Sequence, residues 1–414
     1  MNGPSDWITV SLLVAVAIAA ATVAAWLLRI PYTVALVLAG LLIGVLHGPS
    51  GIPFTPDIVM YVFLPPLLFA AAWEMDLARL RRWWVPIALL ATIGVGIGVA
   101  IAYAVLRFGG HVDPAVAVAF GALVAATDPV AVIALFRELR IDRDLSTIVE
   151  GESLFNDGVA VVLVRALVAG GAGGAATASS SAGSFDLAAT FGSMVALTAG
   201  GTAVGVVIGF GVTALLRLTK VPLVEAAITI LAAFGSYAAG EAVHASGIFA
   251  VIAAGLTCSV VRSRHVPDDV ATETVDRFWE TAAIVANSVL FVLVGLAIDL
   301  PALVAAGPAS AWGIGGVLAA RAAIAYGLMQ VAAFAGARTP AAWRHVVALG
   351  GLRGALAMAL VLGLPENFHD RGLLVAMVFS VVLFTLVIQG LALRPAMRSL
   401  GLSGGGRSAA EPSG

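Results

Sequence analysis

Three carboxylates stand inside otherwise apolar stretches of this chain, within two short polar motifs. Asp128 belongs to Ala125-Ala-Thr-Asp-Pro-Val130, and both Glu152 and Asp157 belong to Glu152-Ser-Leu-Phe-Asn-Asp-Gly158. An ionised residue at the centre of a membrane-spanning helix costs about 2.5–3.5 kcal/mol, so such residues mark ion pathways or proton relays. Because a carboxylate can accept either a proton or a cation, the two motifs predict an ion site.

The composition places these motifs in a membrane protein. Of the 414 residues, 61% are hydrophobic and 11% are charged, whereas about 25% are charged in soluble domains. Many apolar runs have the length of roughly 20 residues that spans a bilayer. The N-terminal Met1-Asn-Gly-Pro-Ser-Asp6 has no basic residue and carries an acid, so the first apolar run is interpreted as a retained span. Basic residues are scattered in twos and threes, and we expect no nucleic-acid partner.

Thirteen spans can be drawn, and the positive-inside rule tests their number independently of hydropathy. With the N-terminus outside and the C-terminus in the cytoplasm, 17 of the 22 Lys and Arg residues fall on the cytoplasmic side. We therefore predict a multi-pass protein of the cell inner (plasma) membrane. The predicted spans are 8–28, 32–47, 57–75, 84–107, 114–137, 146–169, 186–217, 222–240, 243–262, 276–299, 308–335, 343–363 and 371–396.

An odd span in the middle predicts two inverted six-span repeats, the plan of many secondary transporters. One transmembrane domain, 1–400, would hold the first repeat at about 8–169, a linker span at 186–217 and the second repeat at about 222–396. The fifth span is interrupted at Thr127-Asp-Pro129 and the twelfth at Gly350-Gly-Leu-Arg-Gly354. The expected fold is an all-α bundle of about 13 transmembrane helices with broken crossing helices. The Gly/Ala/Ser-rich segment 169–184 is interpreted as a flexible linker, and 401–414 as a disordered tail.

Pro129 determines the chemistry expected of the fifth span. Proline has no N–H and clashes with the carbonyl four residues before it, which frees backbone groups near Ala125. Inside a bilayer such groups must be satisfied by the protein or line a wet cavity. The two half-helices present poles of opposite sign at the break. Thr127 and Asp128 lie beside these poles and form a candidate site for a dehydrated small cation.

Helix geometry divides the polar residues of the sixth span. At about 100° per residue, Ser153 and Asp157 share a face, whereas Glu152 lies about 140° from Asp157. Asp128 and Asp157 are both close to the centres of their spans, so they can meet at the midplane. Glu152 is free to meet a fixed counter-charge on the other side.

Two arginines lie at a comparable depth, Arg321 in the eleventh span and Arg353 in the twelfth. Arginine stays protonated in proteins, so each needs an acidic partner or the negative pole of a helix. Three acids against two arginines leave one net negative charge, which one proton or one monovalent cation neutralises. This is the charge balance of an exchanger.

These motifs resemble those of bacterial NhaP-type Na⁺/H⁺ antiporters, which belong to the monovalent cation:proton antiporter family and consist of a Na⁺/H⁺ exchanger domain. The likeness extends over nearly the whole chain in the same order. It rests on Phe63-Leu-Pro-Pro-Leu-Leu-Phe69, Ala125-Ala-Thr-Asp-Pro-Val-Ala131, Glu152-Ser-Leu-Phe-Asn-Asp-Gly-Val-Ala160, His244-Ala-Ser-Gly247 and Gly350-Gly-Leu-Arg-Gly-Ala355.

The resemblance implies a role for each polar residue of the motifs. Asp157 would be the principal carrier of cation and proton. The implied ion and proton site consists of Asp157, Asp128, Thr127, Ser153 and Asn156. The implied structural ion pair and its support are Glu152, Arg321 and Arg353.

The resemblance also implies how transport proceeds. Asn156-Asp157, in place of the Asp-Asp of electrogenic relatives, implies electroneutral exchange of one proton per cation. Homodimers are implied, with an elevator-like motion of a core domain against a dimerisation domain. Ala70 departs from the pattern, because many NhaP-type members carry a sodium-ligating glutamate directly after the Leu-Pro-Pro-Leu-Leu-Phe run. Glu74 follows one turn later, and the choice among Na⁺, K⁺ and Li⁺ stays open.

The predicted function is secondary active antiport of a monovalent cation, with Na⁺ as first choice, against H⁺ by alternating access at one shared carboxylate site. A K⁺/H⁺ antiporter is one alternative, and a cation channel is an alternative of another class. An intramembrane hydrolase would need a nucleophile with a nearby base, and Ser153 has no convincing one. The sequence has no phosphate loop or metal cluster, so we expect no enzymatic activity and no cofactor. The expected partners are the two ions, membrane lipid and a second copy of the chain.

Overall fold

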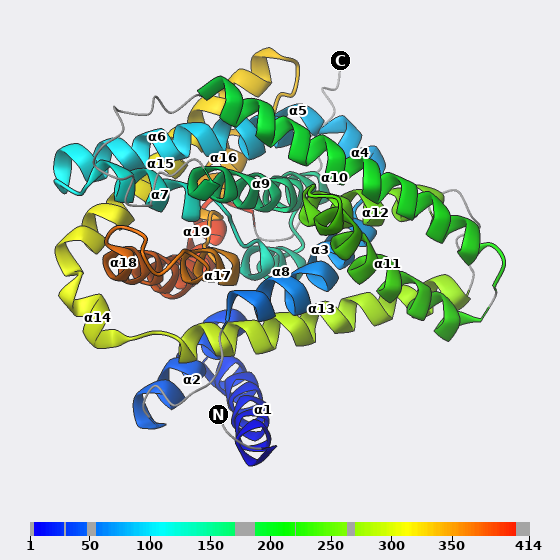
Figure 1. Ribbon diagram of the computed structural model, residues 1–414, viewed down its shortest axis with the longest axis horizontal. Coiled ribbons are helices and arrows are strands. Elements are labelled where there is room, and N and C mark those ends of the chain that lie inside the picture. Colours follow the sequence, from blue (N-terminus) through cyan, green and yellow to red (C-terminus); the bar gives the residue numbers. More distant parts are fainter. Residues whose placement is uncertain are drawn as a thin grey trace, which may run out of the picture.

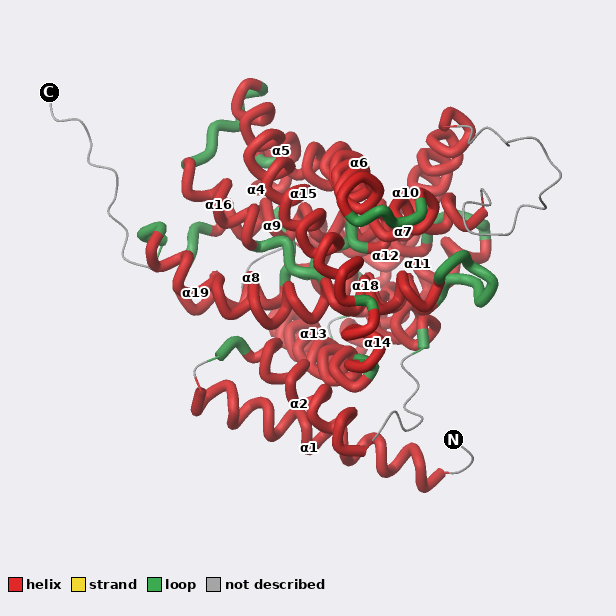
Figure 2. The backbone as a smooth tube through the Cα atoms, turned by 90° about the vertical axis from the view of Figure 1, so that its left-hand side faces the viewer, coloured by secondary structure: helices red, strands yellow, loops and turns green. Residues whose placement is uncertain are grey.

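The computed structural model consists of helices joined by short connections (Figures 1 and 2). It describes residues 4–28, 30–47, 55–169, 187–219, 221–262 and 270–402, and no strand occurs within these ranges. Most of the predicted flexible linker and nearly all of the predicted tail lie outside the described residues. Four basic residues that helped to orient the spans also lie outside them: Arg29, Lys220, Arg264 and Arg407.

The helical segments follow closely on one another, and four of them (η) are π-helical turns. Their bounds are α1 Pro4–Leu28, α2 Tyr32–His47, η1 Ile58–Phe63, α3 Leu64–Glu74, α4 Leu77–Arg82, α5 Trp84–Ala88, η2 Leu89–Ile93, α6 Gly94–Ala104, η3 Val105–Gly109, α7 Pro114–Leu123, α8 Val130–Leu139, α9 Arg143–Ala169, α10 Leu187–Leu216, α11 Pro222–Ala242, α12 Gly247–Arg262, α13 Val270–Leu296, α14 Leu300–Ala305, α15 Gly307–Phe334, α16 Ala341–Leu349, α17 Ala355–Leu362, α18 Arg371–Phe384, η4 Thr385–Gln389 and α19 Gly390–Ser399.

The all-α fold expected from the sequence is confirmed. Each predicted span coincides with one helix, one continuous run of helical segments or one interrupted pair. Among the described residues, 6 helices are long and apolar enough to cross a membrane, accompanied by shorter apolar helices of 10–17 residues. The count of thirteen crossings stays a prediction. Some boundaries differ from the predicted spans, and α13 begins at Val270 and not at 276. Helix α12 begins at Gly247 and not at 243, because the chain turns at His244, whose φ of 56° is left-handed.

Both predicted interruptions are present in the structure. The first separates α7 from α8 over residues 124–129, and the second separates α16 from α17 over residues 350–354. Helices α1 and α2 lie together at one edge of the molecule (Figures 1 and 2). Helix α2 also contacts α8, the second half of the first interrupted helix.

A row of glycines brings α10 against α12. Gly201, Gly205 and Gly209 recur every four residues, and a Cβ at Gly205 would overlap the backbone carbonyl of Ala250. A Cβ at Gly211, on the same helix, would meet no described heavy atom within 4 Å. Small residues of this kind allow close backbone approach in lipid, where no hydrophobic effect drives helices together.

We expect Gly205→Val to destabilise the protein by about 1–3 kcal/mol, because the branched side chain has to push α10 away from α12. Gly211→Val is the matched control, since the same side chain enters open space on the same helix. The difference can be measured as the melting temperature of the purified protein in detergent. Equal melting temperatures for the two variants would contradict this packing.

Candidate ion site

The two helix breaks cross and share a hydrogen bond. The N–H of Asp128, in the first break, donates to the carbonyl of Leu352, in the second, at 2.8 Å. Gly354 lies so close to Asp128 that a Cβ there would overlap the aspartate side chain. Sterics therefore explain why the motif ends in glycine at position 354, since a residue with a Cβ could not approach Asp128 so closely.

Each buried arginine neutralises the negative pole of one broken helix. Arg353 donates from Nη1 to the carbonyls of Ala125 and Ala126, at 2.9 and 3.0 Å, just beyond the end of α7. Arg321 donates from Nε to the carbonyl of Val347, near the end of α16, at 2.8 Å. A positive group at the C-terminal end of a helix is stabilised by the helix dipole. The breaks are therefore compensated electrically as well as by hydrogen bonds.

Helix α9 sorts its polar residues onto two faces. The Glu152 carboxylate pairs with the guanidinium of Arg321, with Oε2 2.9 Å from Nη2 and a second contact between Oε1 and Nη1. Ser153 and Asp157 lie on the other face, in the wall of a large cavity. The structure thus separates Glu152 from Asp157, as the 140° between them on the helix requires.

Thr127 is held against α9 by three hydrogen bonds. Asn156 Nδ2 donates to Thr127 Oγ1 at 2.7 Å, and Asn156 Oδ1 accepts the Thr127 N–H at 3.4 Å. Ser153 Oγ donates to the Thr127 carbonyl. Asp128 Oδ1 accepts the N–H of Val130 at 3.0 Å, in the first turn of α8. These bonds fix the first break against the helix that carries Asp157.

Asp157 presents an unpaired carboxylate oxygen. Its Oδ1 is buried, and no donor in the part of the chain that the structure describes hydrogen-bonds to it. Asp128 lines the same cavity, so two carboxylates face one space. A buried carboxylate oxygen without a hydrogen-bond donor is unfavourable. A proton or a cation at Asp157 would remove this penalty, which makes the position a candidate binding site for one positively charged species.

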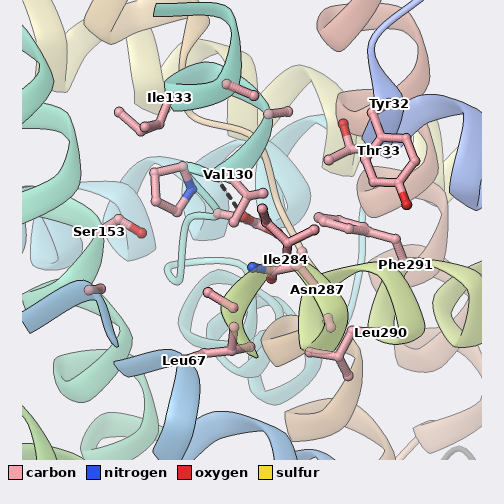
Figure 3. A pocket seen from close by; sticks show the side chains of 18 of the residues that line it. Tyr32, Thr33, Leu67, Val130, Ile133, Ser153, Ile284, Asn287, Leu290 and Phe291 are labelled. Carbon is pink, nitrogen blue, oxygen red and sulfur yellow. Dashed lines mark hydrogen bonds between the residues drawn. The ribbon is translucent and has the colours of Figure 1, made fainter. Parts of the chain in front are cut away.

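A cavity of about 710 Å³ leads to the two aspartates. Figure 3 shows it with Ser153 on one side and Asn287 and Phe291 of α13 on another. Apart from Asp128 and Asp157, the charged residues in its wall lie at the predicted cytoplasmic ends of their spans. They are Glu74, Arg137, Glu138, Glu150, Glu280 and Arg394.

Arg137 links two of these acidic residues across the cavity. Its Nη2 lies 3.1 Å from Glu74 Oε2, on α3, and its Nη1 lies 3.3 Å from Glu280 Oε1, on α13. The three side chains are partly solvent-exposed. They join α8, which follows the first break, to two helices on the other side of the cavity.

The cavity wall differs in two respects from the predicted set of site residues. Asn287 lines it but belongs to none of the motifs, and its only sequence signal is an amide within an apolar span. Asn156 belongs to the predicted set but is absent from the described cavity wall, because it contacts Thr127 from the opposite side. Ala70 is buried and lines the cavity, so the position of the missing glutamate does face the site.

Two interrupted helices that cross beside half-buried carboxylates are typical of secondary transporters with inverted repeats. Comparison with known proteins narrows this class. A model of the sodium/hydrogen exchanger transmembrane family matches residues 12–399, and the chain therefore belongs to that family.

Several relatives have been named for their transport activity. The chain is 35% identical to the low-affinity Na⁺/H⁺ antiporter NhaS1 of Synechocystis, over 91% of this chain and 71% of the relative. It is 37% identical to the Na⁺/H⁺ antiporter ApNhaP of Aphanothece halophytica, with the same coverage. It is 34% identical to the Na⁺/H⁺ antiporter NhaP of Pseudomonas aeruginosa, over 83% of this chain and 81% of the relative.

The fold has a solved counterpart. The structure of the sodium proton antiporter MjNhaP1 from Methanocaldococcus jannaschii at pH 8 superimposes with a TM-score of 0.72 and covers 94% of this chain and 97% of its own. The two sequences are 22% identical, so this likeness supports the fold alone.

We expect Glu152→Gln to lower the stability by about 3–5 kcal/mol, because it leaves Arg321 as a buried charge without its counter-charge. Glu273→Gln is the control, since Glu273 forms an exposed pair with Arg277 that is worth at most about 1 kcal/mol. Melting temperature and the yield of monodisperse protein measure the difference. Similar values for both variants would contradict a stabilising role for the buried pair.

Reversing the pair, with Glu152→Arg and Arg321→Glu together, is expected to restore only part of the stability. A glutamate at position 321 cannot donate to the Val347 carbonyl as the Arg321 Nε does. Full recovery in the same melting experiment would show that the Val347 contact contributes nothing.

Proposed function

We propose that this protein is a monovalent cation:proton antiporter in which Asp157 binds the cation and the proton in turn. The observation that carries the proposal is the buried Asp157 Oδ1, which has no donor among the described residues and belongs to a cavity shared with Asp128. Membership of the sodium/hydrogen exchanger family supports the same conclusion, and the names of the relatives favour Na⁺ as the cation. Ser153 and Thr127 complete the site, and Asn156 supports it by holding Thr127.

The buried charges divide into a fixed part and an exchangeable part. Glu152 and Arg321 compensate each other within their ion pair. The remaining groups, Arg353, Asp128 and Asp157, leave one negative charge, which one proton or one monovalent cation balances. The two ions therefore compete for the same charge, and exchange is electroneutral with one proton per cation. An empty site keeps its negative charge, and moving this charge across the membrane is unfavourable. This prevents ion flux that is not coupled to exchange.

The transport cycle alternates the access of this site. Asp157 releases its proton into the cavity, and the cation then binds between Asp157 and Asp128. The loaded core carries the site to the other side, where the cation leaves and a proton takes its place. Because the charged cavity residues lie at predicted cytoplasmic ends, we assign the observed conformation to the state that is open to the cytoplasm.

The proposed arrangement in the membrane follows the inverted-repeat plan. The repeats are about 8–169 and 222–396, with 186–217 as the linker span, the N-terminus outside and the C-terminus in the cytoplasm of the cell. A homodimer with an elevator-like core motion is part of the proposal. At the predicted outer side Arg165 of α9 pairs with Glu241 of α11 at 3.0 Å. This contact joins the helix that carries Asp157 to one outside the first repeat.

Transport without enzymatic activity is proposed because Ser153 lacks the surroundings of a nucleophile. Its hydroxyl donates to the Thr127 carbonyl, and no described base accepts its proton. The half-buried Asp157 suits a binding site better than the charged ring of a channel pore. Cation flux without counter-movement of protons would favour the channel instead.

We expect Asp157→Asn to reduce cation-driven proton movement to the level of vesicles that lack the protein, because an amide cannot exchange a proton for a cation. The measurement is the pH gradient across everted membrane vesicles when Na⁺, K⁺ or Li⁺ is added. Asp57→Asn serves as the control, since Asp57 is exposed and absent from the described cavity wall. Undiminished exchange by the Asp157→Asn variant would refute the assignment of the carrier.

Ala70 provides a test of cation preference, because its side chain lines the cavity that holds both aspartates. We expect Ala70→Glu to lower the KM for Na⁺ about tenfold, which corresponds to about 1.4 kcal/mol of added binding energy. The wild type should discriminate less among Na⁺, K⁺ and Li⁺ than this variant does. Exchange rates in proteoliposomes over a series of cation concentrations measure both effects.

A neighbouring position supplies the control for the Ala70 experiment. Ala71→Glu introduces the same carboxylate one residue further along α3, at an exposed position of the cavity wall. An equal fall in KM for both variants would indicate general electrostatic attraction. An unchanged KM in Ala70→Glu would show that position 70 is not a ligand position in this protein.

A further inference from the structure

Two side chains of the π-helical turn η4 reach the backbone on either side of the second break. Gln389 Nε2 donates to the carbonyl of Leu349, the last residue of α16. Thr385 Oγ1 accepts the N–H of Arg353, which precedes α17 by two residues, at 3.1 Å. Both side chains are buried, with 7% and 1% of their surface exposed. The break is therefore held at both ends by one turn of another helix.

These contacts satisfy groups that the helix break leaves without a helical partner. Within the break, the N–H of Gly350 bonds to Val346 at 2.7 Å and the N–H of Leu352 bonds to Gly350 at 2.9 Å. Neither bond involves the Leu349 carbonyl or the Arg353 N–H. An unsatisfied backbone group in an apolar environment costs several kcal/mol, so loss of either contact favours a shift of the segment 349–353.

Such a shift would reach the ion site by two direct connections. The guanidinium of Arg353 bonds to the carbonyls of Ala125 and Ala126, beside Thr127. The Leu352 carbonyl accepts the N–H of Asp128 itself. The residues that Thr385 and Gln389 hold are thus the same residues that hold the first break.

Thr385 is oriented for this contact by its own helix. Its hydroxyl donates to the Val382 carbonyl at 3.2 Å, which leaves lone pairs of Oγ1 to accept the Arg353 N–H. Ser380, five residues earlier, donates to the Ala376 carbonyl at 2.8 Å, and its hydroxyl has no second hydrogen bond among the described residues. Bonds from Ser or Thr to the preceding turn are common in helices. Thr385 differs from Ser380 because its hydroxyl oxygen also accepts a hydrogen bond from a residue outside its own helix, the N–H of Arg353.

We infer that Thr385 and Gln389 are positioning residues of the ion site, which act through Arg353 and the Leu352 carbonyl on Asp128 and Thr127. The inference rests on the proposed function, because it assigns these residues to the geometry of cation and proton binding. The turn η4 is the element that supplies both contacts. π-helical turns inside α-helices frequently occur at functional sites.

The experiment compares Thr385→Val, Thr385→Ser, Gln389→Leu and Ser380→Ala in proteoliposomes. Valine keeps nearly the shape of threonine and removes the acceptor, whereas serine keeps the acceptor. We expect Thr385→Val and Gln389→Leu to raise the KM for Na⁺ about three- to tenfold and to displace the pH profile of exchange. Thr385→Ser and Ser380→Ala should keep the wild-type KM and pH profile.

Melting temperatures of the same preparations separate positioning from a purely structural role. A lower melting temperature with unchanged KM and pH profile in Thr385→Val would overturn the inference. If Gln389→Leu does not fold, the comparison of Thr385→Val with Thr385→Ser still tests whether Thr385 positions the ion site. If the wild type shows no exchange, the proposed function fails. The inference about Thr385 is then tested by the rise in melting temperature that Na⁺ causes. Loss of this rise in Thr385→Val but not in Thr385→Ser would support a positioning role, and its retention in Thr385→Val would refute that role.

Discussion

The structure depends on one constraint: two helices are broken within an apolar environment, and the backbone groups freed there need partners. Lipid offers none, so the protein supplies them. The two breaks satisfy part of this demand together, through the bond from Asp128 N–H to the Leu352 carbonyl. Arg353, Arg321 and the turn η4 supply the rest of the contacts described above. Several buried polar residues are thus committed to the framework before any ion binds.

Helix α9 keeps this framework separate from Asp157, the proposed exchangeable charge. The pair of Glu152 and Arg321 lies on one face, and Ser153 and Asp157 lie on the other. A charge that titrates or exchanges its ion needs access to water, whereas a buried ion pair needs hydrogen bonds from its partners in place of water. One helix can serve both needs because residues five positions apart face different directions. The motif Glu-Ser-Leu-Phe-Asn-Asp can be short, because about one and a half helical turns hold both the structural ion-pair residue and the proposed ion carrier.

Much of the fold could be predicted from local rules, whereas the contacts of the site could not. Pro129 and the glycines from 350 to 354 indicate the breaks by their backbone chemistry, and helix geometry alone separates Glu152 from Asp157. Which carbonyls Arg353 caps depends on residues more than 200 positions away in the chain. Thr385 and Gln389 show no motif, because a polar residue in a span gives no sign of the helix it contacts. In the sequence, Ala70 stands out only as a departure from the pattern of similar proteins, and only the structure shows that it lines the cavity.

The capping of Ala125 and Ala126 by Arg353 has a consequence for ion hydration. These are the freed carbonyls that could otherwise have replaced the water around a small cation, and the guanidinium occupies them. The Ser153 hydroxyl gives its proton to the Thr127 carbonyl, and its oxygen lone pairs stay available. A cation bound as proposed between Asp128 and Asp157 would thus find few backbone carbonyls to replace its water and would keep part of its hydration shell. Such a site would recognise charge more sharply than size.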